Sequence, residues 1–153
     1  MLFKRLPEKD LKALEKEFVE FLVLNGIVAD DWIKLKADSP QNASKMVDAF
    51  SDAVYAGMMR KVKYLERIGR SEIMCFYCQH DQIVLVGLET SDESVDFTTM
   101  NDLTNLTAIS QEIQVYTTTK EYDKPREQEI FDMIENGASL GGSTLFNALC
   151  LAL

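Results

Sequence analysis

The fold of this chain is decided by the stretch EIMCFYCQHDQIVLVGL, residues 72–88. Segments 72–79 and 83–88 are rich in β-branched and aromatic residues, which predicts two strands. The polar tripeptide 80–82 between them predicts the turn of a β-hairpin. Because 83–88 is apolar without interruption, we expect both faces of the second strand to be buried.

Helices are predicted on either side of this hairpin from the helical spacing of apolar residues and from capping residues. Before the hairpin, we expect helices over 8–24, over 30–36 and from Ser39-Pro40 to Glu66 or Ile68. After it, we expect a short helix from Thr98 or Thr99 to about 106, a third strand over 113–117, a helix from Pro125 to Glu135 and a last helix from about Ser143. The chain therefore predicts an α+β fold with an N-terminal segment of three helices, a small, mainly antiparallel three-stranded sheet and a C-terminal helix pair.

Length and composition indicate a globular protein. The chain has 153 residues, of which 46% are hydrophobic and 27% are charged, and these fractions are ordinary for a globular domain. The sequence contains no internal repeat and no long linker. We therefore expect residues 1–153 to form a single cooperative domain.

Charge and cysteine content narrow the class of protein. The net charge of −9 disfavours non-specific nucleic-acid binding, which depends on neutralising phosphates, and it disfavours anionic membranes. The apolar run 145–153 is too short to span a bilayer, and the first residues lack the apolar segment of a signal peptide. Three cysteines without framework spacing predict a cytoplasmic protein. We expect no nucleic acid and no membrane as a partner.

Cys75, Cys78 and the only histidine, His80, form the densest group of soft metal ligands in the chain. Side chains of a strand alternate between its faces, so Cys75 and Cys78 should point to opposite faces. A zinc site would have to use Cys75, Cys78, His80 and Cys150, but such sites normally combine two paired-ligand clusters. We interpret Cys75 and Cys78 as core residues and His80 as a solvated turn residue, and we expect no metal and no cofactor.

The segment GASLGGST, residues 137–144, has the glycine spacing of a phosphate-binding loop. However, a serine stands where the phosphate-binding lysine belongs, and a helix rather than a strand precedes the segment. We interpret it as a glycine-rich turn that begins the last helix. Free N–H groups at a helix start can still hold an anion. The candidate anion-binding residues are Gly141, Gly142, Ser143 and Thr144.

Asp48 and Asp52 lie four residues apart on the third predicted helix, and so on one face of it. Paired carboxylates can bind a divalent cation or perform acid–base chemistry. In a chain with 25 acidic residues, such pairs also arise by chance and form a solvated face. Both interpretations stay open, and Asp48 and Asp52 are candidate ligand-binding residues.

Three residues of the helical N-terminal half are candidates for protein contact. Interfaces favour aromatic and methionine side chains, which selects Trp32, Met58 and Met59. No nucleophile-elbow motif is present, and a catalytic triad would have to use His80 at the hairpin turn. No residue is therefore assigned a catalytic role.

Part of the chain resembles a known family. The segments that carry the likeness are Phe18-Val19-Glu20-Phe21-Leu22, Gly26-Ile27, Asp31-Trp32, Pro40, Phe50-Ser51-Asp52, Lys61-Val62 and Tyr64-Leu65-Glu66. Over roughly residues 18–66 they resemble a family of small bacterial proteins without an assigned function. The resemblance implies a bacterial cytoplasmic setting and transfers no functional residue.

These observations favour a non-catalytic interaction or regulatory module that works with a protein partner or as a homo-oligomer. The alternative is a small-ligand-binding protein or an enzyme of another kind. It would use the acidic pair or the glycine-rich turn over 141–144.

Overall fold

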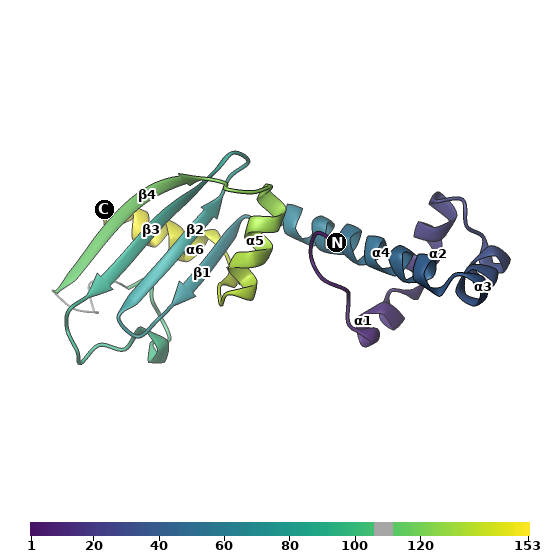
Figure 1. Ribbon diagram of the computed structural model, residues 1–153. Helices are drawn as coiled ribbons and strands as arrows, with labels where there is room; N and C mark the ends of the chain where they lie inside the picture. Colours follow the sequence, from purple (N-terminus) through teal and green to yellow (C-terminus); the bar gives the residue numbers. More distant parts are fainter. Residues whose placement is uncertain (106–111) are drawn as a thin grey trace. The chain divides into compact units, whose positions relative to one another are not determined.

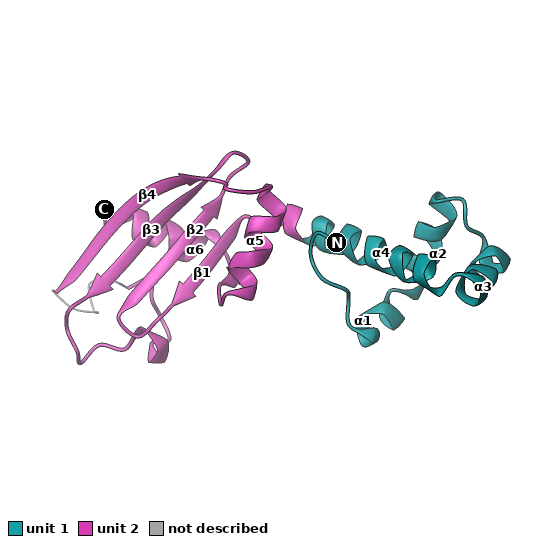
Figure 2. Ribbon diagram, in the orientation of Figure 1, with its two compact units in different colours: residues 1–58 teal, residues 59–153 magenta. Residues whose placement is uncertain are grey.

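The computed structural model describes residues 1–105 and 112–153, and it divides into two compact units, residues 1–58 and 59–153 (Figure 2). The division falls inside the long helix α4 (Pro40–Arg60). The predicted α+β class is confirmed. Among the described residues, no helix is both long enough and apolar enough to cross a membrane.

The first unit is helical (Figure 1). It comprises α1 (Glu8–Ala13), α2 (Glu15–Leu24), α3 (Ala29–Asp38) and the part of α4 that precedes the division. Phe18 and Phe21 of α2 pack on Phe50 of α4, with ring centroids 5.1 and 5.5 Å apart. Trp32 of α3 meets Phe18 edge-on at 5.3 Å. This aromatic cluster is the centre of a small core.

The predicted helix over 8–24 is wrong in one respect, because Leu14 interrupts it. Leu14 has a non-helical backbone conformation, and its side chain lines a hollow together with Leu6 and Val54. The break therefore allows Leu14 to pack beside the N-terminal segment and α4. The predicted end at residue 24 is confirmed, and Gly26 follows with a positive φ of 78°, a conformation that suits glycine.

The second unit is built on a five-stranded antiparallel sheet of order β4-β3-β2-β1-β5. Its strands are β1 (Tyr64–Ile68), β2 (Glu72–Cys78), β3 (Gln82–Thr90), β4 (Ile113–Glu121) and β5 (Ser139–Gly141). A 3-10 turn (Phe97–Thr99) and the helices α5 (Arg126–Glu135) and α6 (Ser143–Leu151) complete it. The predicted hairpin is confirmed as β2 and β3, paired from Glu72↔Glu89 to Cys78↔Ile83.

The main core lies between the sheet and α6, which passes behind the strands in Figure 1. Phe146 and Leu149 of α6 pack against Ile73, Cys75 and Leu88 of the hairpin. The side chains that alternate with these point to the other face of the sheet, where α5 packs. Both faces of β3 are therefore covered at least in part, as its continuous apolar sequence predicts.

The sheet of the structure has two strands more than the predicted three-stranded sheet, namely β1 and β5. The third helix was expected to reach Glu66 or Ile68, but α4 ends at Arg60 and Tyr64–Ile68 forms β1. Leu65 continues the helical spacing of α4, yet the segment pairs with both β2 and β5, and this tertiary pairing outweighs the local pattern. The second missed strand, β5, lies inside the predicted glycine-rich turn.

The short helix expected from Thr98 or Thr99 to about 106 is also wrong over its described part. Only a 3-10 turn forms there, and residue 106 lies outside the described residues. Asp96 caps the start of this turn, because its carboxylate accepts hydrogen bonds from the N–H and the hydroxyl of Thr98. The helix does not continue, because Met100 has an extended backbone and its side chain packs against the core between the sheet and α6.

Candidate functional site

The cysteines of β2 lie where the strand pattern places them. Cys75 packs in the core against α6, and Cys78 belongs to the opposite set of side chains. Burial raises the pKa of the Cys75 thiol to about 12, helped by the nearby Glu66 and Cys150. Burial also raises the pKa of Cys78 to about 11, against the effect of the Arg126 cation. Neither thiol is activated as a nucleophile.

His80 lies at the exposed turn between β2 and β3, with Nε2 3.7 Å from Oδ1 of Asp81. The prediction of a solvated turn residue is confirmed. In the described part of the chain, no three histidine, cysteine, aspartate or glutamate side chains are grouped to hold a metal ion. The structure thus does not bring Cys75, Cys78, His80 and Cys150 together.

The carboxylate of Glu66 lies beside the glycine-rich turn. Gly141 ends β5, Gly142 precedes α6, and Ser143 and Thr144 begin that helix. A Cβ at Gly141 would lie 2.4 Å from Cγ of Glu66, so the missing side chain makes room for Glu66. Burial raises the pKa of Glu66, and a backbone hydrogen bond from Gly142 partly offsets this. An external anion would meet this negative charge.

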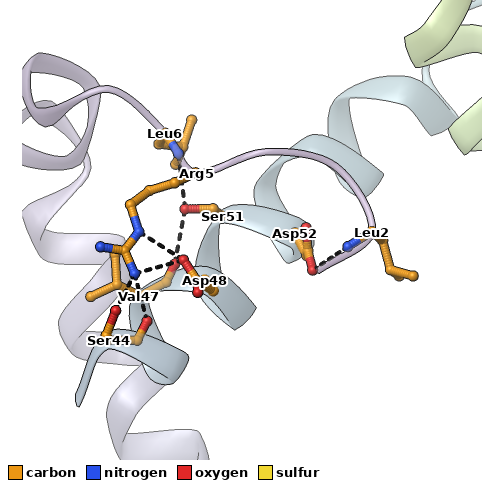
Figure 3. Close-up of polar contacts among 8 residues, drawn as sticks. All are labelled: Leu2, Arg5, Leu6, Ser44, Val47, Asp48, Ser51 and Asp52. Atoms are coloured by element: carbon orange, nitrogen blue, oxygen red, sulfur yellow. Dashed lines mark hydrogen bonds and ion pairs between the residues drawn. The ribbon is translucent and has the colours of Figure 1, made fainter. Parts of the chain in front are cut away.

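The acidic pair of α4 binds the N-terminal segment (Figure 3). Asp52 accepts hydrogen bonds from the backbone N–H groups of Leu2 and Phe3, both at 2.9 Å. Asp48 accepts one from Nε of Arg5 at 2.7 Å. The shared helix face of Asp48 and Asp52 is therefore confirmed, and its contacts are made by residues more than 40 positions away.

Two serines of α4 complete this attachment (Figure 3). The hydroxyl of Ser51, which is fully buried, accepts from the N–H of Leu6 at 3.0 Å and donates to the carbonyl of Val47 at 2.9 Å. Arg5 also donates to the hydroxyl and carbonyl oxygens of Ser44. The polar face of α4 thus binds residues 2–6 through hydrogen bonds.

The three candidate contact residues differ in exposure. The ring of Trp32 is half-buried against Phe18, and Nζ of Lys36 lies 5.8 Å from its centroid. Met58 is 52% exposed, whereas Met59 is 6% exposed and belongs to a core. Of the methionine pair, only Met58 offers its side chain at the surface.

A groove on the α5 side of the sheet was not predicted. Its cavity volume is about 290 Å³. The floor is apolar and comes from three elements: Met74 and Phe76 of β2, Ile83 and Leu85 of β3, and Met133 of α5. The sequence signal for it was present, because uninterrupted apolar residues in β3 indicate a covered second face, but that signal does not say what covers it.

Charged residues border this groove. Glu129 of α5 is buried, and its carboxylate accepts hydrogen bonds from Nζ of Lys120 on β4 and from the N–H of Asp123, the latter at 2.8 Å. The bonds to Glu129 and to Asp123 raise the pKa of Lys120, so the lysine stays charged at neutral pH. Arg67 of β1 also lines the groove, and its Nη2 donates to the carbonyl of Asn136 at 3.2 Å.

The outer edge of β4 is the second feature that the sequence did not reveal. β4 pairs with β3 over nine consecutive positions, from Ile113↔Thr90 to Glu121↔Gln82, and ends the sheet. No strand of the described chain pairs with its other side. Alternate N–H and C=O groups along this side are therefore directed away from the sheet.

Comparison with known proteins gives a match at the level of family. A family described as a family of unknown function (DUF6495) matches residues 1–153. No curated protein and no solved structure matches the chain. The family match confirms the resemblance to a family without an assigned function and extends it from residues 18–66 to the full 153 residues.

Proposed function

The chain belongs to this family of unknown function, and from that premise we propose that it is a non-catalytic protein-interaction module. Its partner adds a strand along the outer edge of β4, and that partner is a second copy of the chain. The observation that carries the proposal is the nine-residue edge of β4, which no strand of the described chain covers. Strand addition to such an edge is a common mode of recognition.

The edge of β4 lacks the features that usually protect an exposed strand. Natural edge strands are kept apart by prolines, bulges, short length or exposed lysines. β4 has no proline, and its register with β3 is continuous over all nine pairs. Its one lysine, Lys120, is held by Glu129 and Asp123. A long, regular and unprotected edge favours pairing with a strand of another chain.

A second copy fits this edge because the central sequence of β4 is self-complementary. An antiparallel pair of β4 strands with its two-fold axis at Thr118 sets Thr117 opposite the partner's Thr119. Threonine pairs across strands are favourable. In the same register Lys120 lies opposite the partner's Tyr116, so no like charges face each other. The product is a sheet in which every neighbour remains antiparallel.

Two paired variants test the dimer and its register. Thr117→Lys with Thr119→Lys places lysines opposite each other twice, whereas Thr117→Lys with Thr119→Glu places lysine opposite glutamate twice. Both variants lose the hydrogen bond from the Thr117 hydroxyl to the Leu85 carbonyl, so that loss cancels in the comparison. Native mass spectrometry should give twice 17.4 kDa for the unmodified chain.

We expect the unmodified chain and the lysine–glutamate variant to be mainly dimeric, and the double-lysine variant to be mainly monomeric. A monomeric unmodified chain at micromolar concentration would overturn the proposal. A double-lysine variant that stays dimeric would also overturn it. Circular dichroism of each variant shows whether the fold is retained. Trp32→Ala, which changes a candidate contact residue of the first unit, should leave the dimer intact.

The proposal also includes a cellular location and a role for this module. We place it in the cytoplasm of a bacterium, on the cysteine content and the resemblance given above, and assign it an interaction or regulatory role. The alternative, a ligand-binding protein or enzyme that uses Asp48 and Asp52 or the turn over 141–144, has less support. The N-terminal segment engages the two aspartates, and Glu66 faces the turn.

A further inference from the structure

The groove between the sheet and α5 carries an inference that is independent of strand addition at β4. We propose that it binds a small carboxylic acid with an apolar body. The apolar part lies on the floor formed by Met74, Phe76, Leu85 and Met133, and the carboxylate pairs with Arg67. All of these residues belong to the second unit.

The size and lining of the groove set the size of the ligand. Its volume of about 290 Å³ is close to the lower end of the range for small-molecule sites, about 300–1,000 Å³. Apart from its polar border, the lining consists of aliphatic, aromatic and thioether side chains. Two of them, Met74 and Met133, are flexible and polarisable, and so adapt to ligands of varied shape. A compact, mostly apolar molecule fits this floor.

The charges at the border favour an anionic group on that molecule. Both oxygens of the Glu129 carboxylate accept hydrogen bonds, Oε1 from Lys120 and Oε2 from the N–H of Asp123. The negative charge of Glu129 is thus matched by Lys120, which also pairs with Asp123 outside the groove lining. Among the charged residues that line the groove, Arg67 and Lys120 are positive and Glu129 is negative, and this excess of positive charge favours an anion.

The chemistry of the guanidinium group identifies the anion as a carboxylate. The group carries five N–H donors, so the bond from Nη2 of Arg67 to the Asn136 carbonyl is compatible with a bidentate contact to a carboxylate. That contact is planar and charge-assisted. The bond to Asn136 also restrains the side chain of Arg67 before a ligand arrives, which lowers the entropy lost on binding.

Titration of the full chain with octanoate and with octan-1-ol separates the apolar and anionic contributions. Isothermal calorimetry should show one octanoate bound per chain and much weaker binding of the alcohol. NMR spectra of the chain with 13C-labelled methionine methyl groups should show shifts at Met74 and Met133. Arg67→Gln should weaken octanoate binding by about tenfold or more, because it removes a charged hydrogen-bond donor, and should leave octan-1-ol unaffected.

Two further variants locate the site. Leu85→Trp fills the groove and should abolish binding of both probes, while Arg70→Gln, outside the groove lining, should bind octanoate as the unmodified chain does. Equal binding of octanoate and octan-1-ol would overturn the assignment of a carboxylate ligand. Absence of octanoate binding at millimolar concentration, or binding that survives in a folded Leu85→Trp variant, would overturn the site.

Discussion

At the scale of single residues, Arg126 holds together the parts of the second unit that surround the start of α5. Its Nε donates to the carbonyl of Gln79, Nη1 to Met59, and Nη2 to Val62 and Cys78, at 2.5–3.2 Å. Its side chain is 14% exposed. A cation beside Met59 is also favourable, because α4 ends there and its last carbonyls lack partners within the helix.

Replacement of Arg126 should therefore destabilise the chain strongly. Arg126→Gln removes the charge and most donors, and we expect it to lower the free energy of unfolding by roughly 2–3 kcal/mol. Arg126→Lys keeps the charge without the planar set of donors and should recover only part of this loss. Urea denaturation measures both, with Arg60→Gln as an exposed control. A loss below that of the control would contradict this role.

The thiol of Cys75 gives a prediction about alkaline pH. Its pKa is raised from 9.0 to about 12 in the folded chain, so between these values the unfolded chain binds fewer protons than the folded chain. Stability then falls as the pH rises through this window. Urea midpoints between pH 8 and 10.5 should fall less steeply for Cys75→Ala than for the unmodified chain. Equal slopes would show that Cys75 does not ionise differently in the two states.

At the scale of elements, α4 and the N-terminal segment form one structural feature. The N–H of Leu6 has its acceptor in the buried hydroxyl of Ser51. Ser51→Ala removes that acceptor, and we expect a loss of about 1–3 kcal/mol in the free energy of unfolding, the usual cost of an unsatisfied buried donor. Ser44→Ala, which truncates a more exposed serine on the same helix, is the control in urea denaturation. Similar losses for the two variants would argue against a special role for Ser51.

Elements could be predicted where the sequence signal is local. The β2–β3 hairpin is one such case, because its strands and its turn all lie within residues 72–88. β1 could not be separated from the end of α4, since Leu65 fits both a helical stripe and a strand. β5 spans only Ser139–Gly141, which is too short to show a strand pattern, and its pairing with β1 cannot be recognised from the local sequence.

The candidate site, too, could be predicted only where the sequence signal is local. The shared face of Asp48 and Asp52 follows from helical spacing alone, but their partners, Leu2, Phe3 and Arg5, are brought by the fold from the start of the chain. The groove also depends on tertiary structure, because its floor joins β2 and β3 to Met133 of α5. Periodicity indicates that a face is apolar, and only the fold decides whether that face is filled or hollow.

At the scale of the whole molecule, the chain combines a thinly packed helical unit with a better packed sheet unit. In residues 1–58, the buried apolar side chains are Leu6, Leu22, Ala43 and Phe50. A unit of this size with so few buried side chains would be marginal by itself. α4 runs through the division between the units without a linker. These two facts favour unfolding of the entire chain in one step, as the prediction of a single domain requires.

Differential scanning calorimetry on the full chain tests this cooperativity. We expect one transition with equal calorimetric and van't Hoff enthalpies. Ser51→Ala lies in the first unit and Arg126→Gln in the second, so in a cooperative chain both variants shift that same transition to lower temperature. If the units unfold independently, two transitions appear and each variant shifts only one of them. The single-domain prediction would then fail, while strand addition at β4 and ligand binding in the groove, which use residues of the second unit alone, would keep their own tests.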